Sequence, residues 1–246
     1  MITTRALGKR FGDTWALRDL DLDVPAGAFL AVLGRNGAGK TTLVRLLTGQ
    51  LRATEGAVTV AGLDPAPAGL ELRRLVGVMP EEGALLEDLG GAQYLQFVGR
   101  LHGLDRRVLA GRIGELEATL EVDFRNPRPI RDYSYGMKKK LAFSAALLHG
   151  PRVVFLDEPF EGLDPSVVQS LLATLEHLRG QGVTLVMTSH QLSLAERLAT
   201  RVLLVEEGRL LVDGAAGDVL GPDEDLEGLF LRLVGRRTRA GKLSWI

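Results

Sequence analysis

The sequence predicts an α/β fold in which a mostly parallel sheet carries an N-terminal antiparallel β subdomain and an inserted helical subdomain. Residues 2–7 and 14–24 alternate apolar and polar side chains, which is typical of two antiparallel strands. Residues 29–33 and 153–156 are short apolar runs of the kind that form buried parallel strands. Residues 84–149 are charge-rich and repeat apolar side chains at helical spacing, so they are expected to form the inserted helices.

The other elements follow from similar patterns along the chain. Phe11, Gly12 and Asp13 are expected to form the turn between the first two strands. Asp164 is expected to cap a helix that starts at Pro165 and stops at Gly180 and Gly182. Further strands are predicted at residues 56–60, 75–79, 183–187, 201–205 and 209–212, the last two as a hairpin.

Beyond Gly221 the periodic signal weakens, and a basic cluster lies in this last segment. A solvated surface is the preferred interpretation of the cluster, and a lipid or partner contact is the alternative. The cluster consists of Arg232, Arg236, Arg237, Arg239 and Lys242.

Composition excludes several classes of function. A chain of 246 residues is long enough for one large domain or for a domain with an inserted subdomain. A net charge of −1 gives no overall attraction to nucleic acid or to anionic lipid. The chain has no cysteine, so disulfides, zinc–thiolate sites and thiol nucleophiles are excluded. The N-terminus resembles no signal peptide and no apolar run is long enough to span a membrane, so we expect a soluble chain whose membrane role is peripheral.

A complete phosphate-binding loop is the most informative motif. It lies between the apolar run at residues 29–33 and a predicted helix at residues 40–48, and this context argues against a glycine-rich turn that matches by chance. Lys40 supplies a positive charge for the β- and γ-phosphates, and the Thr41 hydroxyl is a ligand for Mg²⁺. We therefore expect a nucleoside triphosphate to bind here. The loop residues are Gly34, Arg35, Asn36, Gly37, Ala38, Gly39, Lys40, Thr41 and Thr42.

Two adjacent carboxylates end the apolar strand that starts at Val153. Asp157 is expected to face the Mg²⁺ held by Thr41, and Glu158 to orient and deprotonate the water that attacks the γ-phosphate. A pair of helix-capping carboxylates is the alternative for these two residues. His190, after the strand at residues 183–187, is placed to hydrogen-bond the γ-phosphate and the water, and a purely structural histidine is its alternative.

Taken together, these motifs resemble the ATP-binding subunit of ABC (ATP-binding cassette) transporters over residues 2–220. The strand ending at Asp157 is similar to the Walker B strand of that family, and the segment Gly162–Asp164 to its D-loop. The resemblance makes His190 the switch histidine and Phe11 the aromatic side chain that stacks on adenine. A core or turn role is the alternative for Phe11.

Two positions depart from the family pattern. The signature, Leu-Ser-Gly-Gly-Gln in the family, reads here as Tyr-Ser-Tyr-Gly-Met at residues 133–137, with Ser134 and Gly136 kept and Tyr135 and Met137 different. The glutamine of the family's Q-loop is replaced by Glu81, a carboxylate that still suits Mg²⁺. Both departures resemble the branch that exports drugs, antibiotics, lipids or ions with a separately encoded permease.

The resemblance implies a domain of residues 1–220, with residues 221–246 as a short C-terminal tail. It also implies an ATPase that uses ATP and Mg²⁺ on the cytoplasmic face of a membrane, bound to a transmembrane permease. Its partner in a head-to-tail dimer is a second copy or a related ATPase subunit, which lends its signature in trans. No nucleic acid is expected. A soluble ABC ATPase of translation or DNA repair is one alternative, and a non-hydrolysing nucleotide-binding regulator is another.

Overall fold

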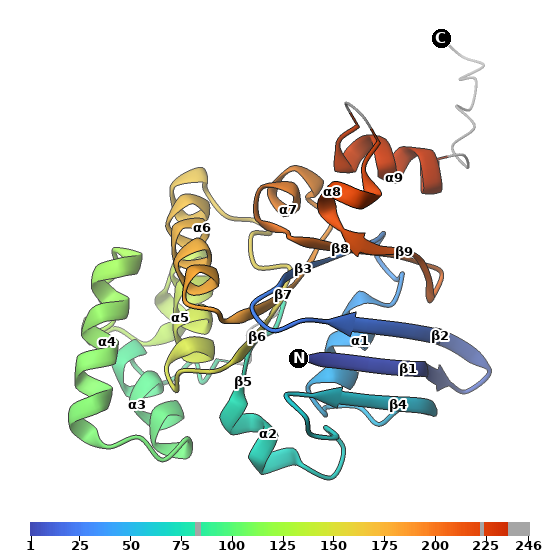
Figure 1. The fold of residues 1–246 in the computed structure, drawn as a ribbon. Coiled ribbons are helices and arrows are strands. Elements are labelled where there is room, and N and C mark those ends of the chain that lie inside the picture. The colour runs from blue at the N-terminus through green and yellow to red at the C-terminus, as the bar shows by residue number, and fades with distance from the viewer. Residues whose placement is uncertain (82–84, 222–223, 236–246) are drawn as a thin grey trace, which may run out of the picture.

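The computed structural model describes residues 1–81, 85–221 and 224–235, which form two sheets surrounded by helices (Figure 1). The first sheet is antiparallel with the order β2-β1-β4, formed by β1 (Ile2–Phe11), β2 (Thr14–Val24) and β4 (Glu55–Val60). The predicted antiparallel subdomain is therefore confirmed. The turn between β1 and β2 is at Gly12 and Asp13, since Phe11 still belongs to β1.

The second sheet is parallel except for its last strand. Its strands follow the order β5-β6-β7-β3-β8-β9, and only β9 runs antiparallel to its neighbour. The carboxyl ends of β3, β6 and β7 consequently lie at one edge of the sheet. The strands are β3 (Phe29–Leu33), β5 (Val76–Met79), β6 (Val153–Asp157), β7 (Thr184–Ser189), β8 (Arg201–Glu206) and β9 (Arg209–Ala215).

Helices cover both faces of this sheet, and a group of them lies on the side away from β1, β2 and β4 (Figure 1). That group occupies the region where inserted helices were expected. It contains α3 (Gly91–Leu101), α4 (Arg106–Leu120), the 3₁₀ turn η1 (Ile130–Asp132) and α5 (Tyr135–Leu147). The other helices are α1 (Lys40–Leu47), α2 (Gly69–Leu75), α6 (Pro165–Gly180), α7 (Leu192–Leu198), α8 (Ala216–Val219) and α9 (Leu226–Val234).

The strands of the parallel sheet are buried on both faces. Along β3, Phe29, Ala31 and Leu33 point into the core shared with α5, α6 and α7, while Leu30 and Val32 point into the core shared with β1, β2 and α1. This alternation is the two-residue period of a strand. It explains why the segment reads as one continuous apolar run.

Helix α5 belongs to two cores at once. Leu141 packs with α3 and α4, whereas Phe143 and Ala146 pack against the sheet. The helix is therefore apolar around most of its circumference. It connects the outer helices α3 and α4 to the parallel sheet.

Two helices differ from the sequence-based expectation. The strand predicted from Leu75 begins at Val76, because Leu75 is the last residue of the short helix α2. The segment after Gly221, where the periodic signal weakens and a short C-terminal tail was expected, contains α9, whose Leu226 and Leu229 are buried in the core. Of the basic cluster, Arg232 pairs with Glu224 at the surface, and the other four residues lie outside the described part of the chain.

None of the helices in the described residues combines the length and the apolarity needed to cross a bilayer.

Candidate active site

The loop after β3 turns so tightly that only glycine fits at two of its positions. Gly34 has φ +157° and Gly39 has φ +113°. A Cβ atom on Gly34 would lie 2.3 Å from the carbonyl oxygen of Val205, and one on Gly39 would lie 2.6 Å from that of Ala16. The neighbouring strands β8 and β2 therefore exclude any side chain from these positions.

Lys40 is the first residue of α1 and its side chain returns into the loop. The residue is 6% exposed, and its ammonium donates hydrogen bonds to the carbonyl oxygens of Gly34 (2.9 Å) and Arg35 (3.4 Å). The same nitrogen lies 3.4 Å from Oε1 of Glu158, an ion pair between two nearly buried groups. The N-terminus of α1, which no side chain caps, adds the positive end of a helix dipole to the same place.

Asp157 and Glu158 are buried at the end of β6, and Thr188 of β7 holds both. The Thr188 hydroxyl donates to Oδ1 of Asp157 (2.5 Å) and accepts from the backbone N–H of Glu158 (3.0 Å). Glu158 has φ +46°, the left-handed conformation that costs a non-glycine residue about 1 kcal/mol or more. In this conformation the Glu158 side chain points toward Lys40 and toward His190, whose Nδ1 lies 3.0 Å from Oε2.

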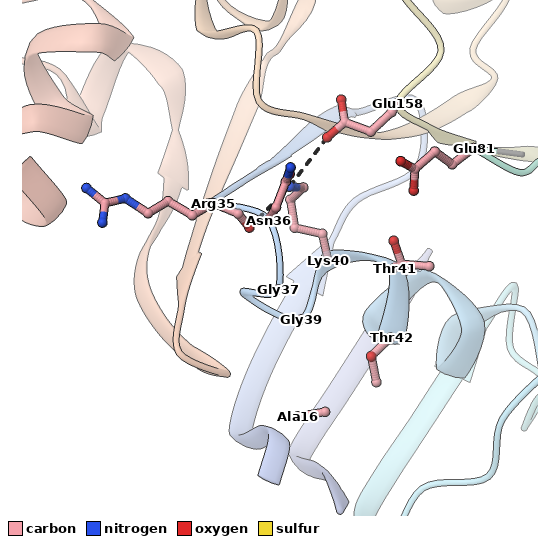
Figure 2. Close-up of a pocket in the computed structure, with 10 residues that line it drawn as sticks. All are labelled: Ala16, Arg35, Asn36, Gly37, Gly39, Lys40, Thr41, Thr42, Glu81 and Glu158. Carbon is pink, nitrogen blue, oxygen red and sulfur yellow. Dashed lines mark hydrogen bonds and ion pairs between the residues drawn. The ribbon is translucent and has the colours of Figure 1, made fainter. Parts of the chain in front are cut away.

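The predicted loop residues line one cavity of about 370 Å³ (Figure 2). In this view Lys40, Thr41, Glu81 and Glu158 gather on one side, whereas the guanidinium of Arg35 points away from them. Of the loop residues, only Gly34 and Ala38 do not line this cavity. The lining residues are Ala16, Arg35, Asn36, Gly37, Gly39, Lys40, Thr41, Thr42, Glu81 and Glu158.

The three residues expected to hold a metal share a second, adjoining cavity. Thr41, Glu81 and Asp157 line this space of about 250 Å³. One hydroxyl and two carboxylates form an oxygen donor set of the kind that Mg²⁺ accepts together with phosphate oxygens. Burial raises the pKa of the Glu81 carboxyl, and the negative charge of Asp157 adds to this effect. The residues therefore fit a Mg²⁺ ion that is shared with a bound triphosphate.

The signature residues lie elsewhere. Ser134, Tyr135, Gly136 and Met137 line a separate cavity of about 380 Å³, together with Asp164. The Ser134 hydroxyl caps α5 by accepting a hydrogen bond from the N–H of Met137 (3.3 Å). Within one chain these residues do not line the cavity of the phosphate-binding loop.

Asp164 occupies the N-cap position of α6, with Pro165 as the first helical residue. Its side chain makes no capping hydrogen bond with the helix, and the residue lines the signature cavity.

Phe11 does not line the nucleotide cavity either. Its side chain is 50% exposed at the end of β1, with the ammonium of Lys9 5.2 Å from the ring centroid. This exposure argues against a core role. The residue of this region that does line the cavity is Ala16 of β2, and the stacking of Phe11 on adenine stays a prediction.

Two residues at the site carried no motif of their own. Thr188 holds both carboxylates from the neighbouring strand, and the one available signal was a hydroxyl at the carboxyl end of a buried strand. Lys139 of α5 donates to the backbone carbonyls of Glu81 (3.0 Å) and Glu158 (3.1 Å), and in the sequence it is one of three consecutive lysines.

The family model described as ABC transporter matches residues 17–161, which is more than half of the chain. The chain belongs to the ABC transporter family. It is an ATP-binding subunit with the ATPase domain of that family, so the predicted fold, family and enzyme class are confirmed. The relatives give no support to a soluble ABC ATPase of translation or DNA repair.

Relatives of this ABC subunit include proteins named for drug resistance and for export. The daunorubicin resistance ATP-binding protein DrrA3 of Streptomyces coeruleorubidus is 39% identical over 218 residues, which cover 89% of this chain and 69% of that protein. The Nod factor export ATP-binding protein I of Cupriavidus pinatubonensis is 34% identical over 221 residues, covering 89% and 68%. A solved ATP-binding subunit of an ABC transporter superposes with a TM-score of 0.89 at 26% identity, covering 95% of this chain and 99% of that structure.

Proposed function

We propose that this ABC subunit hydrolyses Mg-ATP on the cytoplasmic face of a membrane and thereby drives export through a separately encoded permease. The observation that carries the hydrolytic part is the chain of contacts from the buried Lys40 through the buried Glu158 to His190. The relatives named for daunorubicin resistance and Nod factor export support the outward direction.

Lys40 and the loop bind the triphosphate in this proposal. The ammonium exchanges the carbonyls of Gly34 and Arg35 for the β- and γ-phosphate oxygens, which are stronger acceptors because they are charged. The backbone N–H groups at the start of α1 point at the same phosphates. A bound Mg²⁺ supplies neutralisation of phosphate charge, with Thr41, Asp157 and Glu81 as the residues that hold it.

Glu158 is the proposed general base. Its Oε2 is taken by His190, whereas its buried Oε1 accepts no hydrogen bond from the described residues and faces Lys40. Oε1 is therefore the atom with capacity to accept a proton from the attacking water. His190 contacts the carboxylate through its ring Nδ1 and its backbone N–H (3.3 Å), and 41% of its side chain is exposed.

A head-to-tail dimer completes the site. The signature cavity and the nucleotide cavity are separate in one chain, so a second copy or a related subunit is needed to bring Ser134 against the γ-phosphate. The helix that Ser134 caps has 13 residues, and its N-terminus suits an anion. Tyr135 places a ring where the family has a glycine, and Met137 replaces the amide of the family's glutamine by a thioether that donates no hydrogen bond.

The proposed chain organisation is an ATPase domain of residues 1–220, with residues 84–149 as its helical subdomain and residues 221–246 after it. The packing of α3, α4 and α5 into a core of their own supports the separate helical part.

Substitution of Glu158 by Gln tests the hydrolytic role. We expect Glu158→Gln to bind Mg-ATP with wild-type affinity and to lose about 10²- to 10⁴-fold in turnover, because an amide does not accept the proton of water. The matched control is Glu176→Gln, since Glu176 lies exposed on α6. Phosphate release and calorimetric binding are measured on each protein. Near-normal turnover in Glu158→Gln rejects the base.

Mixed subunits test the shared site. A preparation that combines Glu158→Gln and Ser134→Arg chains contains mixed dimers in which one of the two sites carries both lesions and the other carries neither. Activity should therefore exceed the average of the two separate variants. Simple averaging over a range of mixing ratios argues against completion in trans.

A further inference from the structure

Lys139 is a buried lysine whose contacts the nucleotide chemistry does not explain. It lies on the second turn of α5 and is 5% exposed. Its ammonium donates to two backbone carbonyls, that of Glu81 at 3.0 Å and that of Glu158 at 3.1 Å. Lysine is rarely buried to this extent unless its charge is used.

The ammonium sits between several negative groups but does not form a close ion pair with any of them. Burial lowers the pKa of Lys139, and the nearby carboxylates of Glu161, Glu81 and Glu158 oppose this effect. The Tyr135 ring covers the nitrogen from one side, with its centroid 5.6 Å away. The side chain is thus directed at the two carbonyls by its surroundings.

Both carbonyls belong to residues that line the cavity of the phosphate-binding loop. Glu158 is held in the left-handed conformation (φ +46°), which a non-glycine residue keeps only when its surroundings hold it there. The backbone N–H of Glu158 is held by Thr188 at 3.0 Å and its backbone carbonyl by Lys139 at 3.1 Å. The strained residue is therefore held from β7 through its N–H and from α5 through its carbonyl, which also accepts a longer hydrogen bond from the N–H of Glu161 (3.4 Å).

Lys139 acts from outside the nucleotide cavity. It lines a neighbouring cavity of about 430 Å³ with Glu81, Tyr135 and Glu161, and it is not among the residues that line the phosphate-binding cavity. Loss of its ammonium would therefore leave the phosphate-binding loop from Gly34 to Thr42 in place, because the ammonium donates only to the carbonyls of Glu81 and Glu158 among the described residues.

We propose that Lys139 is a positioning residue for ATP hydrolysis, because its ammonium holds the Glu158 and Glu81 carbonyls and so fixes where the Glu158 carboxylate points. This inference rests on the proposed role of Glu158 as the general base. A base displaced by about 1 Å loses on the order of 10²-fold in rate. Lys139 thus affects the rate of the chemical step and leaves nucleotide affinity unchanged.

The first test separates turnover from binding. Lys139→Met is one atom shorter than lysine, keeps an unbranched side chain and removes all three N–H donors. We expect kcat to fall by about 10- to 100-fold, while the KM for ATP stays within about twofold. Lys138→Met is the control, since Lys138 makes a solvent-exposed ion pair with Glu87 at 2.7 Å, and it should keep kcat within about twofold. An unchanged kcat in Lys139→Met overturns the proposal.

The second test asks whether Lys139 acts through Glu158. Lys139→Met is introduced into the Glu158→Gln background, and residual hydrolysis is measured in single-turnover reactions with the enzyme in excess. A positioning residue for this carboxylate should cause less than about a twofold further loss when the carboxylate is already gone. A full repeat of the 10- to 100-fold loss shows a general structural role and contradicts the proposal.

Two controls keep the result interpretable. If Lys139→Met does not fold, Lys139→Leu, which also has no hydrogen-bond donor, replaces it in the same cycle, with the same two outcomes deciding. Wild-type phosphate release is measured in parallel. A wild-type chain that hydrolyses ATP as fast as Lys139→Met defeats only this inference, whereas a wild-type chain without hydrolysis defeats the proposed function.

Discussion

Thr188 offers the sharpest test of how the two strands hold the catalytic carboxylates. Its side chain is fully buried, and one hydroxyl serves both Oδ1 of Asp157 and the backbone N–H of Glu158. Thr188→Val has nearly the same shape, so it creates no cavity. It does leave a buried carboxylate oxygen and a buried N–H group without this partner.

The expected loss follows from these two groups. A buried polar group left without a hydrogen bond costs about 1–3 kcal/mol, so Thr188→Val should lower the free energy of unfolding by about 2–4 kcal/mol. In a domain of this size that corresponds to a fall in Tm of about 5–15 °C. Turnover should fall as well, because the Glu158 N–H loses the hydroxyl that holds it from β7.

Urea unfolding, followed by circular dichroism, measures the stability change without nucleotide. The control is Thr174→Val. The Thr174 hydroxyl donates a hydrogen bond of 2.9 Å to the carbonyl of Ser170 within α6. A carbonyl inside a helix keeps its backbone hydrogen bond when such a hydroxyl is removed. We expect the control to change stability by less than about 0.5 kcal/mol. If Thr188→Val behaves like Thr174→Val, the reasoning about the shared hydroxyl is refuted.

Three further predictions concern the nucleotide loop and one histidine. Lys40→Ala should weaken Mg-ATP binding by about 10- to 100-fold in calorimetry, and unchanged affinity would show that the ammonium does not contact the phosphates. Gly34→Ala should lower the free energy of unfolding in urea by about 2–4 kcal/mol, because its Cβ meets the carbonyl of Val205 at 2.3 Å. Gly37→Ala, which meets no atom within 4 Å, should cost only about 1 kcal/mol, and equal losses would contradict the steric argument. Burial lowers the pKa of His149 from 6.5 to about 4. The unfolded chain therefore takes up this proton at a higher pH than the folded chain does, so the free energy of unfolding should fall by up to about 3 kcal/mol between pH 6.5 and 4 relative to His149→Phe. Urea unfolding at several pH values measures this loss. Equal slopes of unfolding free energy against pH in the two proteins would contradict it.

Contiguous motifs explain why much of the site could be predicted. The loop from Gly34 to Thr42, the carboxylates at the end of β6 and the histidine after β7 each lie in one short segment next to an apolar run. The carboxyl ends of parallel strands meet at one edge of a sheet. The segments therefore predicted that Lys40, Glu158 and His190 lie at one edge of the sheet, where Nζ of Lys40 lies 3.4 Å and Nδ1 of His190 3.0 Å from the Glu158 carboxylate.

Prediction was weaker where a local pattern was short or mixed. The helix α2 has seven residues and only Leu72 is buried, which leaves too few apolar positions to show a period. The helix α9 lies within a segment whose charges suggested a solvated tail, yet its Leu226 and Leu229 pack into the core. The burial of these side chains depends on α7 and the sheet, which lie far away in the chain.

By itself the sequence determined the family, the strand–loop–helix that holds phosphate and the residue types available for magnesium and water. Backbone conformation and chemistry of this kind are encoded within a few neighbouring residues. The tertiary structure alone decided that Thr188 holds both carboxylates, that Lys139 holds the Glu158 carbonyl 19 residues away, and that Ser134 opens onto a different cavity from Lys40. These contacts depend on strand order and on the rotation of α5 about its axis, which are set by the packing of the whole core.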